Sequence, residues 1–120
     1  MTPPPICIAI VDDETSVRTA LARLLKLAGY EVKQYASGDE FLVAVTVQPP
    51  DCVLLDVSMP GLSGIDVLSL LKVKAIELPV ILITATDQAD FMAQCPDMPE
   101  LILKKPFTSD ALLAAIDAAL

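Results

Sequence analysis

The chain has 120 residues, of which 54% are hydrophobic, so it can bury the core of one ordinary domain but is too short for two. Eight Lys and Arg residues against sixteen Asp and Glu residues give a net charge of −8, which argues against nucleic-acid binding by this domain itself. The absence of histidine excludes imidazole zinc sites and Ser-His catalytic triads.

The N-terminal residues, MTPPP, lack the basic and apolar regions of a signal peptide, and we expect residues 1–5 to be a flexible lead. No apolar run approaches the roughly 18 residues of a membrane span, so we expect no membrane partner. Three cysteines without the spacing of metal ligands fit a reducing cytoplasm.

The first strand and helix are predicted before residue 30. The run ICIAIV at 6–11 is apolar throughout, which is typical of a parallel strand covered on both faces. It is followed directly by two carboxylates, Asp12 and Asp13. Apolar residues at helical spacing over 17–28 predict a helix, and Gly29 is its stop signal.

The second strand–helix pair leads to a buried third strand. Residues 30–36 alternate apolar and polar side chains, which indicates an edge strand. Ser37 and Glu40 have the spacing of a capping box at the start of a helix. The apolar run at 51–56 predicts a third strand that ends in Asp56.

The third and fourth helices flank a fourth strand. Ser63 is a candidate N-cap for a helix, and the run at 79–84 predicts a buried strand that ends in Thr84. Residues 87–99 predict a short fourth helix, because two prolines limit its length.

The last elements are a strand at 101–104 and a C-terminal helix. Lys104 and Lys105 end the strand before Pro106. Either Thr108 or Ser109 can cap the helix that follows.

Strands and helices in alternation predict an α/β fold, a doubly wound five-stranded parallel sheet with helices on both faces. In such sheets ligands bind beyond the carboxyl ends of the strands, where the strand order reverses. The residues at these ends are Asp12, Asp13, Asp56, Thr84 and Lys105.

Three carboxylates at neighbouring strand ends repel one another unless a cation joins them. Oxygen ligands without histidine suit a hard ion such as Mg²⁺. For Asp12 and Asp13 alone, a solvated strand end with a helix cap is an equally good interpretation. Asp56, Thr84 and Lys105 at matching positions favour a site, in which a carboxylate beside Mg²⁺ attacks a phosphoryl group.

The motifs IVDDE, LLDVSMPGLSGIDVL, PVILITA and KKPF, in this order, resemble the receiver domain of bacterial two-component response regulators. The resemblance covers residues 6–120 and implies a flavodoxin-like strand order of 2-1-3-4-5. It implies that Asp56 is the phosphoacceptor, that Asp13 and Asp56 bind Mg²⁺ directly, and that Asp12 acts through water. The main-chain carbonyl of Ser58 would be a further ligand.

The same resemblance implies that Thr84 follows the phosphoryl group, that Lys105 pairs with it, and that the Lys105–Pro106 peptide bond is cis. It also implies that the chain is a signalling domain that catalyses its own phosphorylation and dephosphorylation. Its partners would be a sensor histidine kinase or a phosphotransfer protein, with homodimer formation on phosphorylation. The resemblance further suggests that the full protein is a transcriptional response regulator with a DNA-binding output domain. A stand-alone receiver and a receiver from a hybrid kinase are the alternatives.

Two departures from the family fall outside this group of residues. Ile102 replaces the usual aromatic residue of the switch, and CPDMPE replaces the usual Gly-Ala pair before the last strand. We therefore expect the signal to leave through Thr84 and a backbone change at 85–99. A phosphatase of the haloacid dehalogenase type would need an Asp where Ser58 stands, and a flavin binder would need a phosphate loop. The remaining alternative is a non-phosphorylated pseudo-receiver that acts as an interaction module.

Overall fold

The computed structural model describes residues 5–85 and 101–120. Five parallel strands form one sheet in the order β2-β1-β3-β4-β5, which confirms the predicted α/β fold. The elements are β1 (Cys7–Val11), α1 (Thr15–Leu27), β2 (Glu31–Tyr35), α2 (Gly38–Val47), β3 (Cys52–Asp56), α3 (Gly64–Val73), β4 (Val80–Thr84), β5 (Leu101–Lys104) and α5 (Ser109–Ala119). The fourth helix predicted within 87–99 lies outside the described residues.

The strand boundaries differ from the prediction by one residue at several ends. β1 begins at Cys7 and β3 at Cys52, although the apolar runs suggested 6–11 and 51–56. At this end of the sheet the carboxylate of Asp51 accepts the N–H of Cys7 at 2.7 Å. The side chain of Asp51 thus serves as a partner at the start of β1. β2 pairs with β1 at one end of the strand order, as expected for an edge strand.

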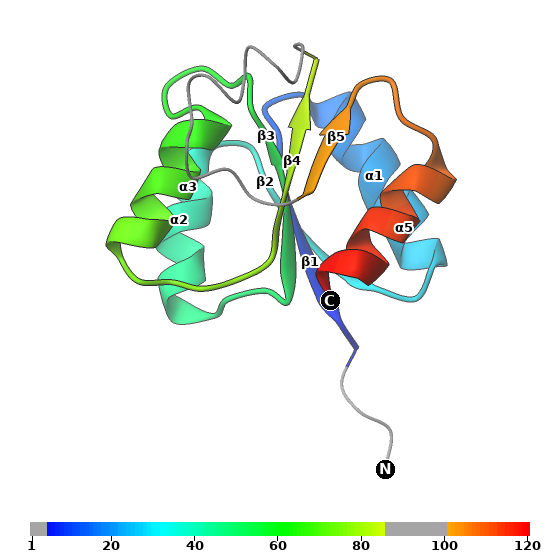
Figure 1. The fold of residues 1–120 in the computed structure, drawn as a ribbon, viewed down its shortest axis with the longest axis horizontal. Coiled ribbons are helices and arrows are strands. Elements are labelled where there is room, and N and C mark those ends of the chain that lie inside the picture. Colours follow the sequence, from blue (N-terminus) through cyan, green and yellow to red (C-terminus); the bar gives the residue numbers. More distant parts are fainter. Residues whose placement is uncertain (1–4, 86–100) are drawn as a thin grey trace.

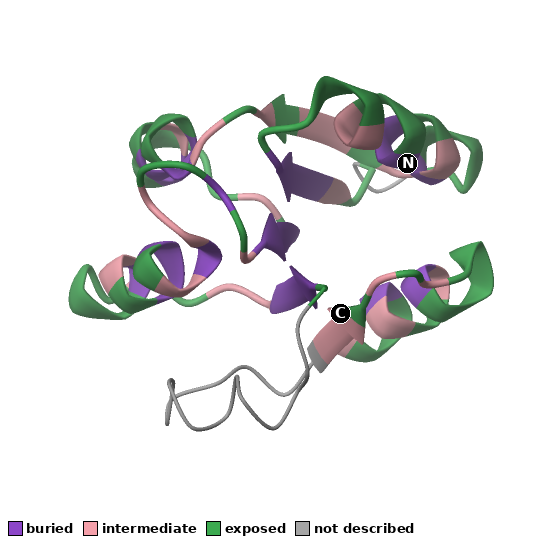
Figure 2. Cartoon of the chain, turned by 90° about the horizontal axis from the view of Figure 1, so that it is seen from above, coloured by how far each residue is buried: buried purple, intermediate pink, exposed green. Residues whose placement is uncertain are grey.

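The sheet separates two hydrophobic cores, because successive side chains of a strand point to opposite faces. Helices α2 and α3 cover one face, and α1 and α5 cover the other (Figure 1). Figure 2 shows the same arrangement from above, with the buried central strands between helices whose outer surfaces are exposed. The fully buried side chains of the α2–α3 core are Ala9, Val11, Phe41, Val53, Leu55, Val67 and Leu82; those of the α1–α5 core are Ile8, Leu25, Cys52, Leu54, Ile81, Leu112 and Ile116.

Three helices begin at hydroxyl side chains. Ser37, Ser63 and Thr108 each accept the backbone N–H three residues further on, at 3.2, 3.2 and 3.1 Å. These bonds satisfy donors that a helix leaves without an internal partner. Thr108, and not Ser109, is therefore the cap of α5.

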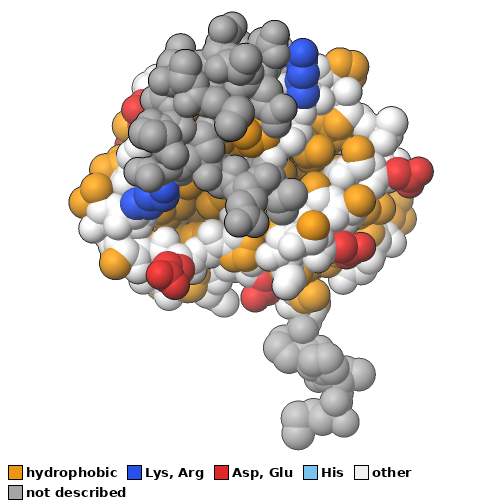
Figure 3. All heavy atoms as spheres, in the orientation of Figure 1, with side chains coloured by type: hydrophobic (Ala, Val, Ile, Leu, Met, Phe, Trp, Pro, Cys, Tyr) orange, Lys and Arg blue, Asp and Glu red, His pale blue; other side chains and the backbone are white. Residues whose placement is uncertain are grey.

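The surface is mixed in character. On the face of Figure 3, acidic side chains stand apart from one another among apolar ones. None of the helices within the described residues is long and apolar enough to span a bilayer.

Candidate functional site

The register of the sheet brings the acidic residues together. β1 and β3 pair in parallel with Val11 opposite Leu55, so the next residues along, Asp12 and Asp56, leave the two strands side by side. Side chains two residues apart on a strand point to the same face, so Asp12 and Asp56 continue the rows of β1 and β3 side chains that face the α1–α5 core. The neighbouring strands β1 and β3 thus place the carboxylates of Asp12 and Asp56 close together at the same edge of the sheet.

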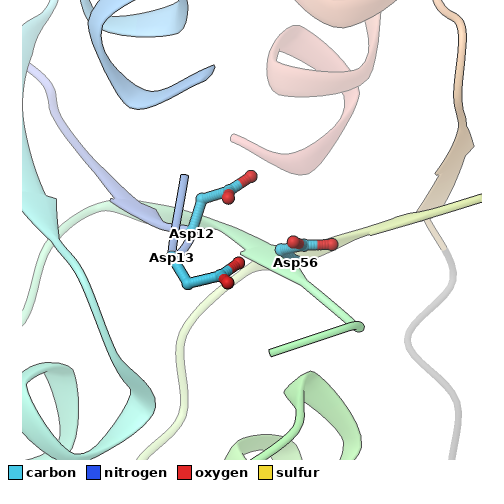
Figure 4. A group of neighbouring side chains, drawn as sticks. All are labelled: Asp12, Asp13 and Asp56. Atoms are coloured by element: carbon cyan, nitrogen blue, oxygen red, sulfur yellow. The ribbon is translucent and has the colours of Figure 1, made fainter. Parts of the chain in front are cut away.

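The two neighbouring aspartates of the β1–α1 turn have different environments. Asp12 is 1% exposed and Asp56 is 5% exposed, whereas Asp13 is exposed. One carboxylate oxygen from each of Asp12, Asp13 and Asp56 lies within 4.8 Å of the others (Figure 4). Three such groups at this separation repel one another strongly when all are ionised.

The donor atoms fit a hard divalent cation. All three side chains offer oxygen, the ligand atom that Mg²⁺ prefers. Among the described residues, Asp12 Oδ2 is a buried oxygen without a hydrogen-bond partner. A buried oxygen without a partner is unfavourable unless water or an ion satisfies it. The cluster could therefore hold a metal ion.

The carboxyl of Asp56 titrates far from its ordinary range. Burial, followed by the charge of Asp12, raises the pKa of Asp56 from 3.8 to about 6. Lys105, whose Nζ lies 3.9 Å from Asp56 Oδ1, and the N–H of Ser58, which donates to the same oxygen at 3.4 Å, oppose this rise in pKa. Asp13 adds a smaller upward contribution to the pKa.

The ends of β4 and β5 complete this side of the sheet. Thr84 is buried at the end of β4, and its carbonyl accepts the N–H of Lys105 at 2.8 Å. The Lys105–Pro106 peptide bond is cis. Lys104, one residue earlier, is exposed, while Lys105 turns toward Asp56.

The other candidate residues have different surroundings. Ser58 is exposed two residues after Asp56. Ile102 is half-buried against the α2–α3 core. The segment 85–99, expected to change on signalling, lies almost wholly outside the described residues.

Two residues near the site were missed by the sequence reading. Arg18 Nη1 donates to the carbonyl of Asp12 at 2.6 Å. Gly64 begins α3 so close to β3 that a Cβ there would stand 2.5 Å from the carbonyl oxygen of Asp56. The available signals were an arginine in the first turn after an acidic pair, and a glycine directly after a capping serine.

A known protein family matches the chain over nearly its whole length. A family model described as the response regulator receiver domain matches residues 8–117. Response regulator MprA of Mycolicibacterium vanbaalenii is 37% identical over 97% of this chain and 51% of its own length. Sporulation initiation phosphotransferase F of Bacillus subtilis is 36% identical over 91% of this chain and 89% of its own. The chain spans only 24% of the transcriptional regulator NtrC of Klebsiella pneumoniae, to which it is 38% identical over 92% of its own length.

Solved structures agree with these sequence matches. Chemotaxis protein CheY4 of Vibrio cholerae superposes with a TM-score of 0.88 at 26% identity, over 98% of this chain and all of the other. A response regulator receiver domain protein from Clostridium thermocellum gives a TM-score of 0.84 at 31% identity, over 95% of this chain and 93% of the other.

Proposed function

Because this chain belongs to the response regulator receiver domain family, whose members act in phosphorelay signalling, we propose that Asp56 is its phosphoacceptor. One observation carries the proposal. Asp12, Asp13 and Asp56 bring carboxylate oxygens within 4.8 Å of one another, and the Lys105 ammonium lies 3.9 Å from Asp56. An anionic nucleophile between a cation-binding cluster and an ammonium is the arrangement that phosphoryl transfer needs.

The acidic cluster would hold Mg²⁺, with Asp13, Asp56 and the main-chain carbonyl of Ser58 as direct ligands and Asp12 acting through water. The oxygen-only donor set and the unsatisfied Asp12 Oδ2 support this ion. When bound, Mg²⁺ would supply positive charge against the developing charge of the phosphoryl oxygens.

The reaction is a transfer from nitrogen to oxygen. A carboxylate oxygen of Asp56 attacks the phosphorus of a phosphohistidine on a sensor kinase or phosphotransfer protein. The O–P bond forms as the N–P bond breaks, and the electron pair of that bond returns to the imidazole. The ammonium of Lys105 and the hydroxyl of Thr84 would each take one phosphoryl oxygen, since both leave the sheet beside Asp56.

The test is direct phosphorylation with a small acyl phosphate. We expect a mass gain of one phosphoryl group that requires Mg²⁺, disappears with EDTA and maps to Asp56. The Asp56→Asn variant is the matched control, because it keeps the shape of the side chain. A fully folded wild-type protein that gains no phosphoryl group would overturn the proposal and favour a non-phosphorylated interaction module.

The related proteins support further proposals on the domain bounds, location and output of the full protein. We place the receiver unit at residues 6–120 behind a lead at 1–5, acting in the cytoplasm, with homodimer formation on phosphorylation. The name of NtrC supports a transcriptional output, and the greater lengths of NtrC and MprA support an output domain beside the receiver unit. The near-complete match to phosphotransferase F supports the alternative of a stand-alone receiver.

A further inference from the structure

The β1–α1 turn is held by hydrogen bonds to almost every polar atom of Asp12. Its N–H donates to the carbonyl of Tyr35 in β2 at 3.2 Å. Its Oδ1 accepts the N–H of Glu14 at 2.9 Å. Its carbonyl accepts Arg18 Nη1 at 2.6 Å, which leaves Oδ2 as the one polar atom of Asp12 without a partner.

Arg18 differs from the other partners because it is a charged side chain that spans the whole turn. Its Nη2 also donates to Thr15 Oγ1 at 3.2 Å, so two nitrogens of one planar group bind two points of the turn. The guanidinium fork is rigid and remains protonated, which makes such paired bonds well defined in direction. The turn between them carries both Asp12 and Asp13.

We propose that Arg18 is a positioning residue for the cation site: by holding the carbonyl of Asp12 it fixes the turn so that Oδ2 of Asp12 and the carboxylate of Asp13 face Asp56. This inference rests on the metal site proposed above. Without Arg18, the carbonyl of Asp12 loses its charged partner and the turn can rotate. Both carboxylates then move away from the position that a bound ion requires.

The loss of charge and the loss of positioning in an Arg18→Ala variant predict opposite changes in Mg²⁺ affinity, which makes the proposal testable. The positive charge of the Arg18 guanidinium repels a cation bound at the acidic cluster. Electrostatics alone therefore predicts that an Arg18→Ala variant binds Mg²⁺ more tightly. Loss of positioning predicts weaker binding. Outer partners of metal ligands typically change metal affinity by about 10–100-fold, and we expect a dissociation constant about tenfold higher.

The experiment is calorimetric titration of Mg²⁺ into the unphosphorylated 120-residue chain. Arg23→Ala is the matched control, because it removes the same charge from an exposed position of the same helix. We expect it to bind Mg²⁺ as tightly as wild type or slightly more tightly. Arg18→Lys keeps the charge but not the fork, and we expect weakened binding there too. Circular dichroism and melting in EDTA show whether each variant is folded; if Arg18→Ala is not, Arg18→Lys carries the test.

Kinetics provides a second readout. If Arg18 acts through the ion, excess Mg²⁺ restores the phosphorylation rate of Arg18→Ala, whereas it cannot restore that of Asp56→Asn. Affinity in Arg18→Ala equal to or tighter than that of Arg23→Ala would overturn this inference and leave the metal site intact. A wild-type chain that does not bind Mg²⁺ would overturn the metal site and, with it, the role of Arg18.

Discussion

The Asp56→Asn variant should be more stable than wild type when no divalent cation is present. The pKa of Asp56 is raised from 3.8 to about 6, so the folded protein binds this proton more tightly than the unfolded chain does. Each unit of difference in pKa corresponds to about 1.36 kcal/mol, so ionised Asp56 lowers the free energy of unfolding by about 3 kcal/mol at neutral pH. Asparagine has no charge to bury but loses the attraction of Lys105. We therefore expect a gain of about 1–3 kcal/mol.

The sign of the pH dependence follows from the raised pKa. As pH falls through 6 toward 4, Asp56 of the wild type becomes protonated and the cost of its buried charge disappears. The Asp56→Asn variant has no such charge, so this effect does not change its free energy of unfolding. The assay is urea unfolding in EDTA at pH 7.5 and pH 4.5, with Glu31→Gln as a control that removes one exposed carboxylate. We expect the gap between Asp56→Asn and wild type to shrink at the lower pH. It should also shrink with Mg²⁺, since a ligand that binds only the folded state adds about 2.7 kcal/mol at a hundredfold excess over Kd. A variant no more stable than wild type at pH 7.5, or a gap independent of pH, would refute this reasoning.

Three further predictions concern the backbone at the two ends of α3 and the route of the signal. Gly64→Ala should lower the free energy of unfolding by about 1–3 kcal/mol in urea melts, because its Cβ would stand 2.5 Å from the Asp56 carbonyl oxygen; an unchanged midpoint would contradict the close approach. Ala75→Gly should raise that free energy by about 0.5–1 kcal/mol, because Ala75 has a φ of 56° just after α3, where glycine fits without strain; a loss of stability would count against this. Beryllofluoride should change hydrogen exchange across 85–99, because Ile102 has no ring to rotate; a response confined to α1 or α5 would exclude this route.

The order of the described elements was predictable because four of the five strands are apolar runs with a polar side chain at or directly after their ends, whereas β2 alternates apolar and polar residues. The strand ends were also enough to gather Asp12, Asp56 and Lys105 on one side of the sheet. This holds because parallel strands all present their carboxyl ends to the same edge. Capping residues could likewise be read from the sequence, since a serine or threonine three residues before its N–H partner is a local feature.

The sequence could not show which of Asp12 and Asp13 is buried. Both follow the same apolar run, and the face on which each one lies depends on the parity of β1 in the finished sheet. Arg18 was missed for a related reason. Its bond to the Asp12 carbonyl depends on one rotamer of a long side chain, and no spacing rule specifies that rotamer.

The division of the interior into two cores means that substitutions in one core should add to substitutions in the other. Substitutions more than about 7–10 Å apart without shared partners usually have additive effects within about 0.3–0.5 kcal/mol. Phe41 and Leu112 belong to different cores on opposite faces of the sheet, so their truncations should combine without coupling. Substitutions in the helices on one face of the sheet therefore need no compensating substitutions in the helices on the opposite face. Divergence on either helical face need not disturb the strands that hold Asp56.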